Sequence, residues 1–208
     1  CAADMIHAVA AMAAYLLGSL SGSLLLGKLR GVDIRTLGSG NAGGTNALRT
    51  QGPLFAAGVA VIDIGKGVAA AVLAEGLLPG NAPVALAAVF AAVIGHIWPV
   101  FHGFRGGKGA ATLVGGLIIV WPQALALLLA VWCLCLLLTG YVGLSTVLAA
   151  FSLLLSAYWF KADAGVYLFA AASAALLAYS HRSNLRRLRS GTEPRFEKAR
   201  ILGRLFSG

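Results

Sequence analysis

The feature that most constrains this chain is a series of apolar stretches, most of them close to the length that crosses a membrane. A helix needs about 20 apolar residues to span the hydrocarbon core of a bilayer. Seven stretches approach that length: about 5–27, 53–75, 82–101, 109–121, 122–139, 141–160 and 163–180. Only 11% of the 208 residues are charged, whereas soluble domains have roughly 25%. The sequence therefore predicts an all-α integral membrane protein, a bundle of seven transmembrane helices. The alternative is six spans with a re-entrant segment at the short fourth stretch.

Basic residues are distributed very unevenly between the two sides of this bundle. If the N-terminus lies outside, 14 of the 16 Lys and Arg residues fall on the inner side. The exceptions are Lys66, which lies within a span, and Lys161. Because Lys and Arg are retained in cytoplasmic loops, we expect the N-terminus outside and the C-terminus in the cytoplasm. The net charge of +9 then serves topology and contact with anionic headgroups. Nucleic-acid binding is the weaker interpretation, because no basic soluble domain carries the charge.

The sequence indicates one domain without a disulfide framework or a metal site. No linker, low-complexity tract or repeat interrupts residues 1–208, which we expect to form a single domain. Cys133 and Cys135 lie two residues apart within one span and so on divergent helix faces. Cys1 begins the chain in place of Met, which is compatible with a processed or lipid-modified terminus. The inner segments contain no His, Cys, Asp and Glu cluster with ligand spacing, so we expect no metal and no cofactor.

One inner segment, GHIWPVFHGFRGGKGAAT at 95–112, is rich in glycine and basic residues. Glycines let a ligand approach the backbone, Arg105 and Lys108 add positive charge, and a helix follows, which together suit an anion. At a membrane face such a site indicates a phosphorylated lipid precursor. A basic loop that only obeys the topology rule is the alternative. A Walker A site is excluded, because His102 and Gly109 stand where that motif needs Gly and Ser or Thr.

Two further inner segments carry polar side chains. GSGNAGGTNALR at 38–49 combines glycines, hydroxyls and amides with Arg49, whose planar guanidinium suits phosphate. A plain turn needs only two to eight residues, so this segment favours a function. HRSNLRRLRSGTE at 181–193 contains arginines that a membrane anchor explains. Positive charge alone does not require its His181, Asn184 and Glu193.

Asp63 and Lys66 lie in the middle of the second apolar stretch, three residues apart and so on one helix face. Ionised groups at that depth cost several kcal/mol unless they are paired or face a wet cavity. An internal ion pair and a direct role in the site are equally open. In both cases the face that carries the two residues points into the bundle.

The three inner segments resemble the signature segments of the bacterial acyl-phosphate:glycerol-3-phosphate acyltransferases, the PlsY family, and DIGKG at 63–67 is similar to a shorter fourth feature. The blocks occur in family order on one membrane side. The resemblance implies a seven-span enzyme of the bacterial inner membrane with a cytoplasmic active site. It implies transfer of an acyl group from acyl phosphate to the 1-hydroxyl of sn-glycerol 3-phosphate, which gives lysophosphatidic acid for phospholipid biosynthesis. Its partners are then these two substrates and membrane lipids.

The resemblance also implies roles for individual residues. Ser39 and Arg49 are the polar pair of the first segment, and His181, Asn184 and Glu193 are the essential polar residues of the third. The glycerol-phosphate loop of the second segment comprises Gly103, Gly106, Gly107, Lys108 and Gly109. The candidate catalytic set is Ser39, Arg49, Lys108 and His181. The candidate substrate-binding set adds Asn41, Thr45, Asn46, Lys66, His96 and Thr112 to the loop glycines and to the third segment's Asn184 and Glu193.

The residue types suit this chemistry on their own. An acyl phosphate is a mixed anhydride with a good leaving group, so the protein has to place a hydroxyl near the carbonyl, neutralise two phosphates and stabilise an oxyanion. Arg49, Lys108 and backbone amides can neutralise phosphate, and Ser39 or Asn41 can donate to the carbonyl oxygen. The H-x-x-x-x-D pair of many thioester-dependent acyltransferases is absent, which favours acyl phosphate over acyl-CoA.

Two questions stay open at this point. The group that takes the hydroxyl proton is His96, His181 or a phosphate oxygen of the substrate, and a structural role is favoured for both histidines. The rival class is a membrane carrier for organic phosphates, which Asp63 and Lys66 within a span would also suit. A carrier needs polar access from both sides, and the outer connections contain almost no polar residues.

Overall fold

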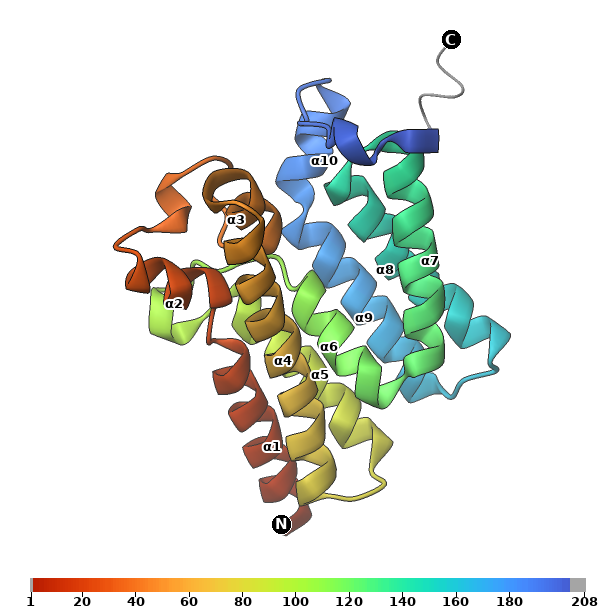
Figure 1. Cartoon of the computed structure of the whole chain (residues 1–208). Coiled ribbons are helices and arrows are strands. Elements are labelled where there is room, and N and C mark those ends of the chain that lie inside the picture. The colour runs from red at the N-terminus through yellow and green to blue at the C-terminus, as the bar shows by residue number, and fades with distance from the viewer. Residues whose placement is uncertain (1, 203–208) are drawn as a thin grey trace. The chain divides into compact units, whose positions relative to one another are not determined.

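The computed structural model describes residues 2–202, so the interpretation of Cys1 as a processed terminus lies outside the described residues. Helices joined by short loops make up this part of the chain, and no strand occurs in it (Figure 1). The predicted all-α class is therefore confirmed for the described residues. The chain divides at Trp121 and Pro122 into two compact units, which we call unit 1 and unit 2.

Unit 1 contains the first and second polar segments. Its long helices pack in the pairs α4 with α6, α1 with α5, and α1 and α5 with α4. The elements are α1 (Ala2–Gly18), α2 (Gly22–Leu29), the 3-10 helix η1 (Ile34–Thr36), α3 (Gly44–Gln51), α4 (Pro53–Leu77), α5 (Ala82–Ile97), the 3-10 helix η2 (Val100–His102) and α6 (Ala110–Val120). The short elements α2, α3 and η2 lie at the end of unit 1 away from the N-terminus (Figure 1).

Small residues bring the helices of unit 1 close together. A Cβ on Gly67 of α4 would collide with the backbone of Thr112 in α6, and one on Gly115 would collide with the backbone of Ile64. Helices in lipid associate through this kind of backbone approach, because apolar side chains gain little by leaving lipid. The same logic explains a core made largely of alanine: Ala10, Ala14, Ala70, Ala74, Val84, Ala85, Ala88 and Ala92.

Unit 2 contains the third polar segment. Its helices pack in sequence, α7 with α8 and α8 with α9, and α10 contacts both α8 and α9. The side chain of Asp163 caps α9 by accepting the backbone N–H of Val166 at 3.0 Å. The elements are α7 (Pro122–Thr139), α8 (Val142–Trp159), α9 (Ala164–Ser180), α10 (Arg182–Arg189) and the 3-10 helix η3 (Glu197–Ala199).

Within residues 2–202, four to six helical segments are long and apolar enough to cross a membrane. Four qualify alone, and two bent pairs qualify if each is one span: Met5–Gly18 with Gly22–Leu29, bent by 42°, and Ala164–Ser180 with Arg182–Arg189, bent by 58°. The expected fourth span is α6, whose 11 residues reach about 16 Å at 1.5 Å per residue, short of the roughly 30 Å hydrocarbon core. The chain is therefore a multi-pass membrane protein, while the count of seven spans and the orientation of the termini stay predictions.

Candidate active site

The first polar segment is folded around the side-chain amide of Asn46, a residue that is 2% exposed. Its Nδ2 donates to the backbone oxygens of Leu37 and Asn41, both at 3.0 Å, and lies 3.2 Å from that of Ile34. Its Oδ1 accepts the backbone N–H of Ser39 at 2.9 Å. The amide of Asn46, which the sequence places in the substrate-binding set, thus uses its polar atoms to close the loop.

Other polar side chains of this segment face outward. Three of them are exposed: Ser39, Thr45 and Arg49. Asn41 is partly exposed. Gly38 and Gly40 have φ angles of 55° and 71°, which glycine adopts at no steric cost. The sharp turn that they allow separates the buried amide of Asn46 from the exposed hydroxyl of Ser39.

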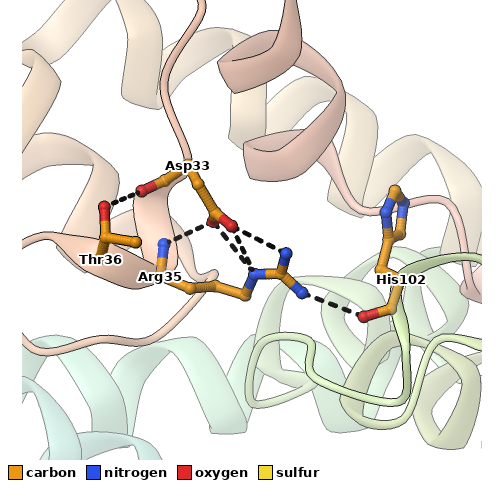
Figure 2. A network of polar contacts seen from close by, with 4 residues as sticks. All are labelled: Asp33, Arg35, Thr36 and His102. Carbon is orange, nitrogen blue, oxygen red and sulfur yellow. Dashed lines mark hydrogen bonds and ion pairs between the residues drawn. The ribbon is translucent and has the colours of Figure 1, made fainter.

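Arg35 of η1 lies just before the first segment and contacts the second segment (Figure 2). Its guanidinium donates hydrogen bonds to the Asp33 carboxylate, from Nη2 to Oδ2 at 2.8 Å and from Nε to Oδ1 at 3.0 Å. Its Nη1 donates to the backbone oxygen of His102 at 3.0 Å. The hydrogen bond from Arg35 holds the pKa of Asp33 below its ordinary value, and the same contact raises the pKa of Arg35. Arg35 therefore links the turn before the first segment to the second segment, and its contacts at Asp33 and His102 hold its side chain in one conformation.

The second segment folds back onto the end of α5. The backbone N–H of Gly106 donates to Ile97 at 3.2 Å, and that of Gly107 donates to the backbone oxygen of His96 at 3.1 Å. A Cβ on Gly107 would lie 3.1 Å from the backbone oxygen of Ala42, so the two segments meet at this glycine. Both N–H groups thus donate inside the protein, and both glycines lie at close packing contacts.

The rest of the second segment leads into α6. Gly103 and Gly109 have φ angles of 64° and 88°, in the left-handed region that favours glycine. Lys108 between them is partly exposed. Thr112 in the first turn of α6 is fully buried, and its Oγ1 has no hydrogen-bond partner among the described residues. The exposed chemistry of this stretch is therefore cationic: the guanidinium of Arg105, which is exposed, and the ammonium of Lys108.

Asp63 and Lys66 of α4 form a buried cluster with His96, at the start of the second segment. Lys66 Nζ lies 3.0 Å from Asp63 Oδ1 and 2.7 Å from His96 Nδ1, and the same imidazole nitrogen lies 3.4 Å from Asp63 Oδ1. At most 4% of any of these side chains is exposed. Asp63 and Lys66 share one face of α4, as their spacing predicts. Mutual pairing offsets the several kcal/mol that each buried ion costs.

The same pair holds the break between α1 and α2. Asp63 Oδ1 accepts the backbone N–H of Gly22, the first residue of α2, at 3.1 Å. Lys66 Nζ donates to the backbone oxygen of Leu20, just after α1, at 2.7 Å. A carboxylate at a helix start and an ammonium after a helix end match the signs of the helix dipoles. The charges therefore satisfy backbone groups that a broken span leaves without helical partners.

In unit 2, the third segment is organised by Glu193, whose side chain is 4% exposed. Asn184 Nδ2 donates to its Oε1 at 2.6 Å, and Arg187 Nε donates to its Oε2 at 2.8 Å. The backbone oxygen of Arg187 accepts the N–H groups of Thr192 and Glu193. A Cβ on Gly143 of α8 would collide with Asn184, which fixes this side chain from the other side. Asn184 and Glu193 are thus partners of each other.

His181 lies at the bend between α9 and α10 and is 5% exposed. Its Nδ1 is 2.8 Å from the backbone oxygen of Leu177 and 3.2 Å from Ser180 Oγ. A carbonyl oxygen can only accept, so Nδ1 carries the proton, and in the neutral ring the acceptor lone pair belongs to Nε2. His181 therefore has the tautomer that a proton acceptor at Nε2 requires.

The structure thus brings the first and second segments and the Asp63–Lys66 pair together within unit 1, and the residues of the third segment together within unit 2. Sequence reasoning missed Arg35. The capping position of Asp33 before a short helix was a readable signal, but the carbonyl of His102 is 67 residues away and needs the fold. Among residues 2–202, no three His, Cys, Asp or Glu side chains gather as a metal site would need.

Apolar helices joined by glycine-rich basic loops define the class of this molecule, a multi-pass helical membrane protein. The chain belongs to the glycerol-3-phosphate acyltransferase family, whose family model matches residues 8–191. The family that the three segments predict is therefore confirmed.

Individual relatives agree with this assignment over nearly the whole chain. The glycerol-3-phosphate acyltransferase of Chlorobaculum tepidum is 38% identical, covering 90% of this chain and 95% of its own. That of Gloeobacter violaceus is 42% identical, covering 88% and 91%. A crystal structure of PlsY (YgiH), an integral membrane glycerol 3-phosphate acyltransferase in its glycerol 3-phosphate form, superposes with a TM-score of 0.87 at 36% identity, covering 94% of this chain and 98% of the other. The lysophosphatidic acid form of PlsY gives a TM-score of 0.85 at 35% identity, covering 97% and 99%.

Proposed function

We propose that this protein transfers an acyl group from an acyl phosphate to the 1-hydroxyl of sn-glycerol 3-phosphate, which yields lysophosphatidic acid and inorganic phosphate. The observation that carries the proposal is the contact between the two glycine-rich segments at Ala42 and Gly107. Arg49 and Lys108 stand on these two segments, so unit 1 presents two cations for a reaction between two phosphorylated substrates. The names of the relatives and the two ligand forms of PlsY support the acceptor and the product.

Each reacting group has a candidate partner among the outward side chains. The hydroxyl oxygen of glycerol 3-phosphate attacks the carbonyl carbon of the acyl phosphate, the bond from that carbon to the phosphate oxygen breaks, and inorganic phosphate leaves with the electron pair. Arg49 suits a two-pronged phosphate contact, and Lys108 supplies a point charge for the other phosphate. Ser39 or Asn41 donates to the developing oxyanion.

The proton of the hydroxyl goes to His181 or to a phosphate oxygen of a bound substrate in this proposal. His96 is an unsuitable acceptor, because its Nδ1 faces the Lys66 ammonium at 2.7 Å and its side chain is buried. His181 has its proton on Nδ1, which leaves the basic lone pair on Nε2. Arg49, Lys108, Ser39 and His181 remain the proposed catalytic set.

We also propose that residues 1–208 act as one acyltransferase domain in the bacterial inner membrane, with seven spans, an external N-terminus and the active site on the cytoplasmic face. The uneven distribution of Lys and Arg supports this orientation. The short helix α6 would be the fourth of the seven spans, reaching only part of the bilayer depth. Membrane lipids and the two substrates are the proposed partners.

The test compares two acyl donors that carry the same chain. Purified protein in detergent receives radiolabelled glycerol 3-phosphate with either a long-chain acyl phosphate or the matching acyl-CoA. We expect labelled lysophosphatidic acid and one equivalent of inorganic phosphate from the acyl phosphate alone. Product formation from acyl-CoA at a comparable rate would contradict the assigned donor, and the Arg49→Ala variant serves as the inactive control.

A further inference from the structure

Gly107 and the imidazole of His96 are packed too closely to admit another side chain. A Cβ on Gly107 would collide first with Nε2 of His96. The φ angle of Gly107 is outside the left-handed region, unlike those of Gly103 and Gly109. Glycine at 107 is therefore required by a neighbouring side chain and not by its own backbone conformation.

Gly106 is constrained by a different kind of neighbour. A Cβ on Gly106 would collide with the backbone oxygen of His96 and would lie 2.7 Å from the ring of Pro99. The side chain of residue 96 takes no part in this crowding. Gly106 thus packs against the backbone of His96, whereas Gly107 packs against its side chain.

The opposite edge of the His96 ring is fixed by charge. Its Nδ1 lies within 2.7 Å of Lys66 Nζ and 3.4 Å of Asp63 Oδ1. Both charged groups are anchored in turn, Lys66 to the backbone of Leu20 and Asp63 to that of Gly22. The imidazole therefore cannot rotate away from Gly107 without breaking contacts to a buried ion pair.

We propose that His96 is a positioning residue for the second segment. Asp63 and Lys66 hold its ring through Nδ1, and the Nε2 edge sets where the backbone at Gly107, and with it the neighbouring Lys108, lies. This inference rests on the proposed function in so far as Lys108 binds a substrate phosphate. It assigns Lys66 and His96 to the support of the loop, because both are buried and their polar atoms are engaged within the protein.

A shorter side chain at position 96 should rescue an alanine at position 107. Gly107→Ala should raise the KM for glycerol 3-phosphate about tenfold, the size of effect that overpacking produces. An asparagine at 96 keeps a polar atom at the position of Nδ1 but ends before Nε2, so it opens the space that the new methyl group needs. The double variant His96→Asn/Gly107→Ala should therefore have a KM within about threefold of that of His96→Asn alone, whereas independent effects would add and leave it about tenfold higher.

Gly106→Ala provides the matched control, because it adds the same methyl group one residue earlier against backbone atoms. His96→Asn leaves these atoms in place, so it should not rescue Gly106→Ala. His96→Gln, which restores a polar group near Nε2 and removes the one at Nδ1, should rescue neither glycine variant. A loss of stability alone would not distinguish the two glycines in this way.

The readout is the KM and kcat for glycerol 3-phosphate together with the thermal stabilisation that this substrate gives in the absence of any acyl donor. If the proposed reaction is wrong, the unaltered protein will show no turnover with acyl phosphate. The thermal stabilisation by glycerol 3-phosphate still reports on the loop in that case, so the two failures can be told apart. Size-exclusion profiles establish that each variant is folded, and His96→Ser, which opens the same space, replaces His96→Asn where needed. Equal rescue of both glycine variants, or rescue of neither by Asn or Ser, would overturn the proposal.

Discussion

Asn184 and Glu193 hold each other in place: the side-chain amide of Asn184 donates to Glu193 Oε1 at 2.6 Å, and the carboxylate is nearly buried. The second oxygen of the same carboxylate accepts Arg187 Nε. One acidic residue thus fixes the geometry of the whole third segment, and its removal leaves a partly buried donor without its acceptor.

Glu193→Ala should therefore lower the free energy of unfolding by about 1–3 kcal/mol and reduce activity, because the amide of Asn184 loses its partner. Glu193→Gln keeps a carbonyl oxygen for Asn184 but places an NH2 group opposite Arg187 Nε, which loses its acceptor and the opposite charge. Because Arg187 is partly exposed and can turn to water, the effect should be smaller than that of Glu193→Ala. Thermal unfolding in detergent measures both. A Glu193→Ala variant with unchanged stability and no activity would instead indicate direct contact with substrate.

Arg49→Lys should be nearly as damaging to kcat/KM as Arg49→Ala. Lysine keeps the charge but cannot form the planar two-pronged contact with a phosphate that we propose for Arg49. Arg189→Lys, the same exchange at an exposed position of α10, is the matched control and should have little effect. Steady-state kinetics with each substrate varied in turn measure kcat/KM for the three variants. Near-normal activity of Arg49→Lys would contradict the proposed two-pronged contact with phosphate.

The buried pair of α4 predicts strong coupling between two substitutions. Asp63→Asn or Lys66→Met leaves the other charge buried and unpaired, which should cost about 3–5 kcal/mol of stability. The double variant removes both charges and should recover part of that loss. Additive losses in thermal unfolding experiments would show that the two side chains do not stabilise each other.

The contact between Asp33 and Arg35 predicts a pH dependence confined to acid. Because the folded-state pKa of Asp33 is lowered, the pair stabilises the protein above the ordinary pKa of the carboxyl and stops doing so as the pH falls through the folded-state value. Asp33→Asn should thus flatten the stability profile only below about pH 4. Asp33 is exposed and Arg35 is partly exposed, so water screens the pair and the expected loss at neutral pH is at most about 1 kcal/mol.

Membrane topology is tested with single cysteines in a background where Cys1, Cys133 and Cys135 are replaced by serine. Ala162→Cys should react with an impermeant thiol reagent added outside intact cells, whereas Thr50→Cys and Ser190→Cys should react only after the membrane is permeabilised. The permeabilised sample controls for buried thiols. The reverse pattern would contradict both the orientation and the cytoplasmic position of the polar segments.

Much of this arrangement could be predicted from the sequence, because local signals carry it. Apolar length indicated the helices, and the spacing of Asp63 and Lys66 placed them on one face of α4, where they pair. Glycine content and charge marked the loops. The break after α1 was not predicted, because Ser19 and Ser21 are only two small polar residues within a long apolar stretch. The interruption is stabilised by the distant Asp63 and Lys66.

The roles of individual loop residues depended on tertiary contacts that no local pattern shows. Asn46 could be recognised as a polar loop residue, but its inward orientation follows from backbone acceptors on both sides of the turn. The requirement for glycine at 107 follows from the ring of His96, eleven residues earlier in the chain, and not from a turn. Sequence reasoning identified the chemistry of the loop and could not assign which glycine serves conformation and which serves packing.

The contact between Gly107 and His96 also sets an order on how the sequence can change. If alanine arises at 107 while histidine occupies 96, the new methyl group meets the ring. If a shorter residue arises at 96 first, the same alanine finds space. Two substitutions that are compatible together can therefore be reached readily by only one route, and the residue tolerated at 107 in any descendant of this chain depends on the history of position 96.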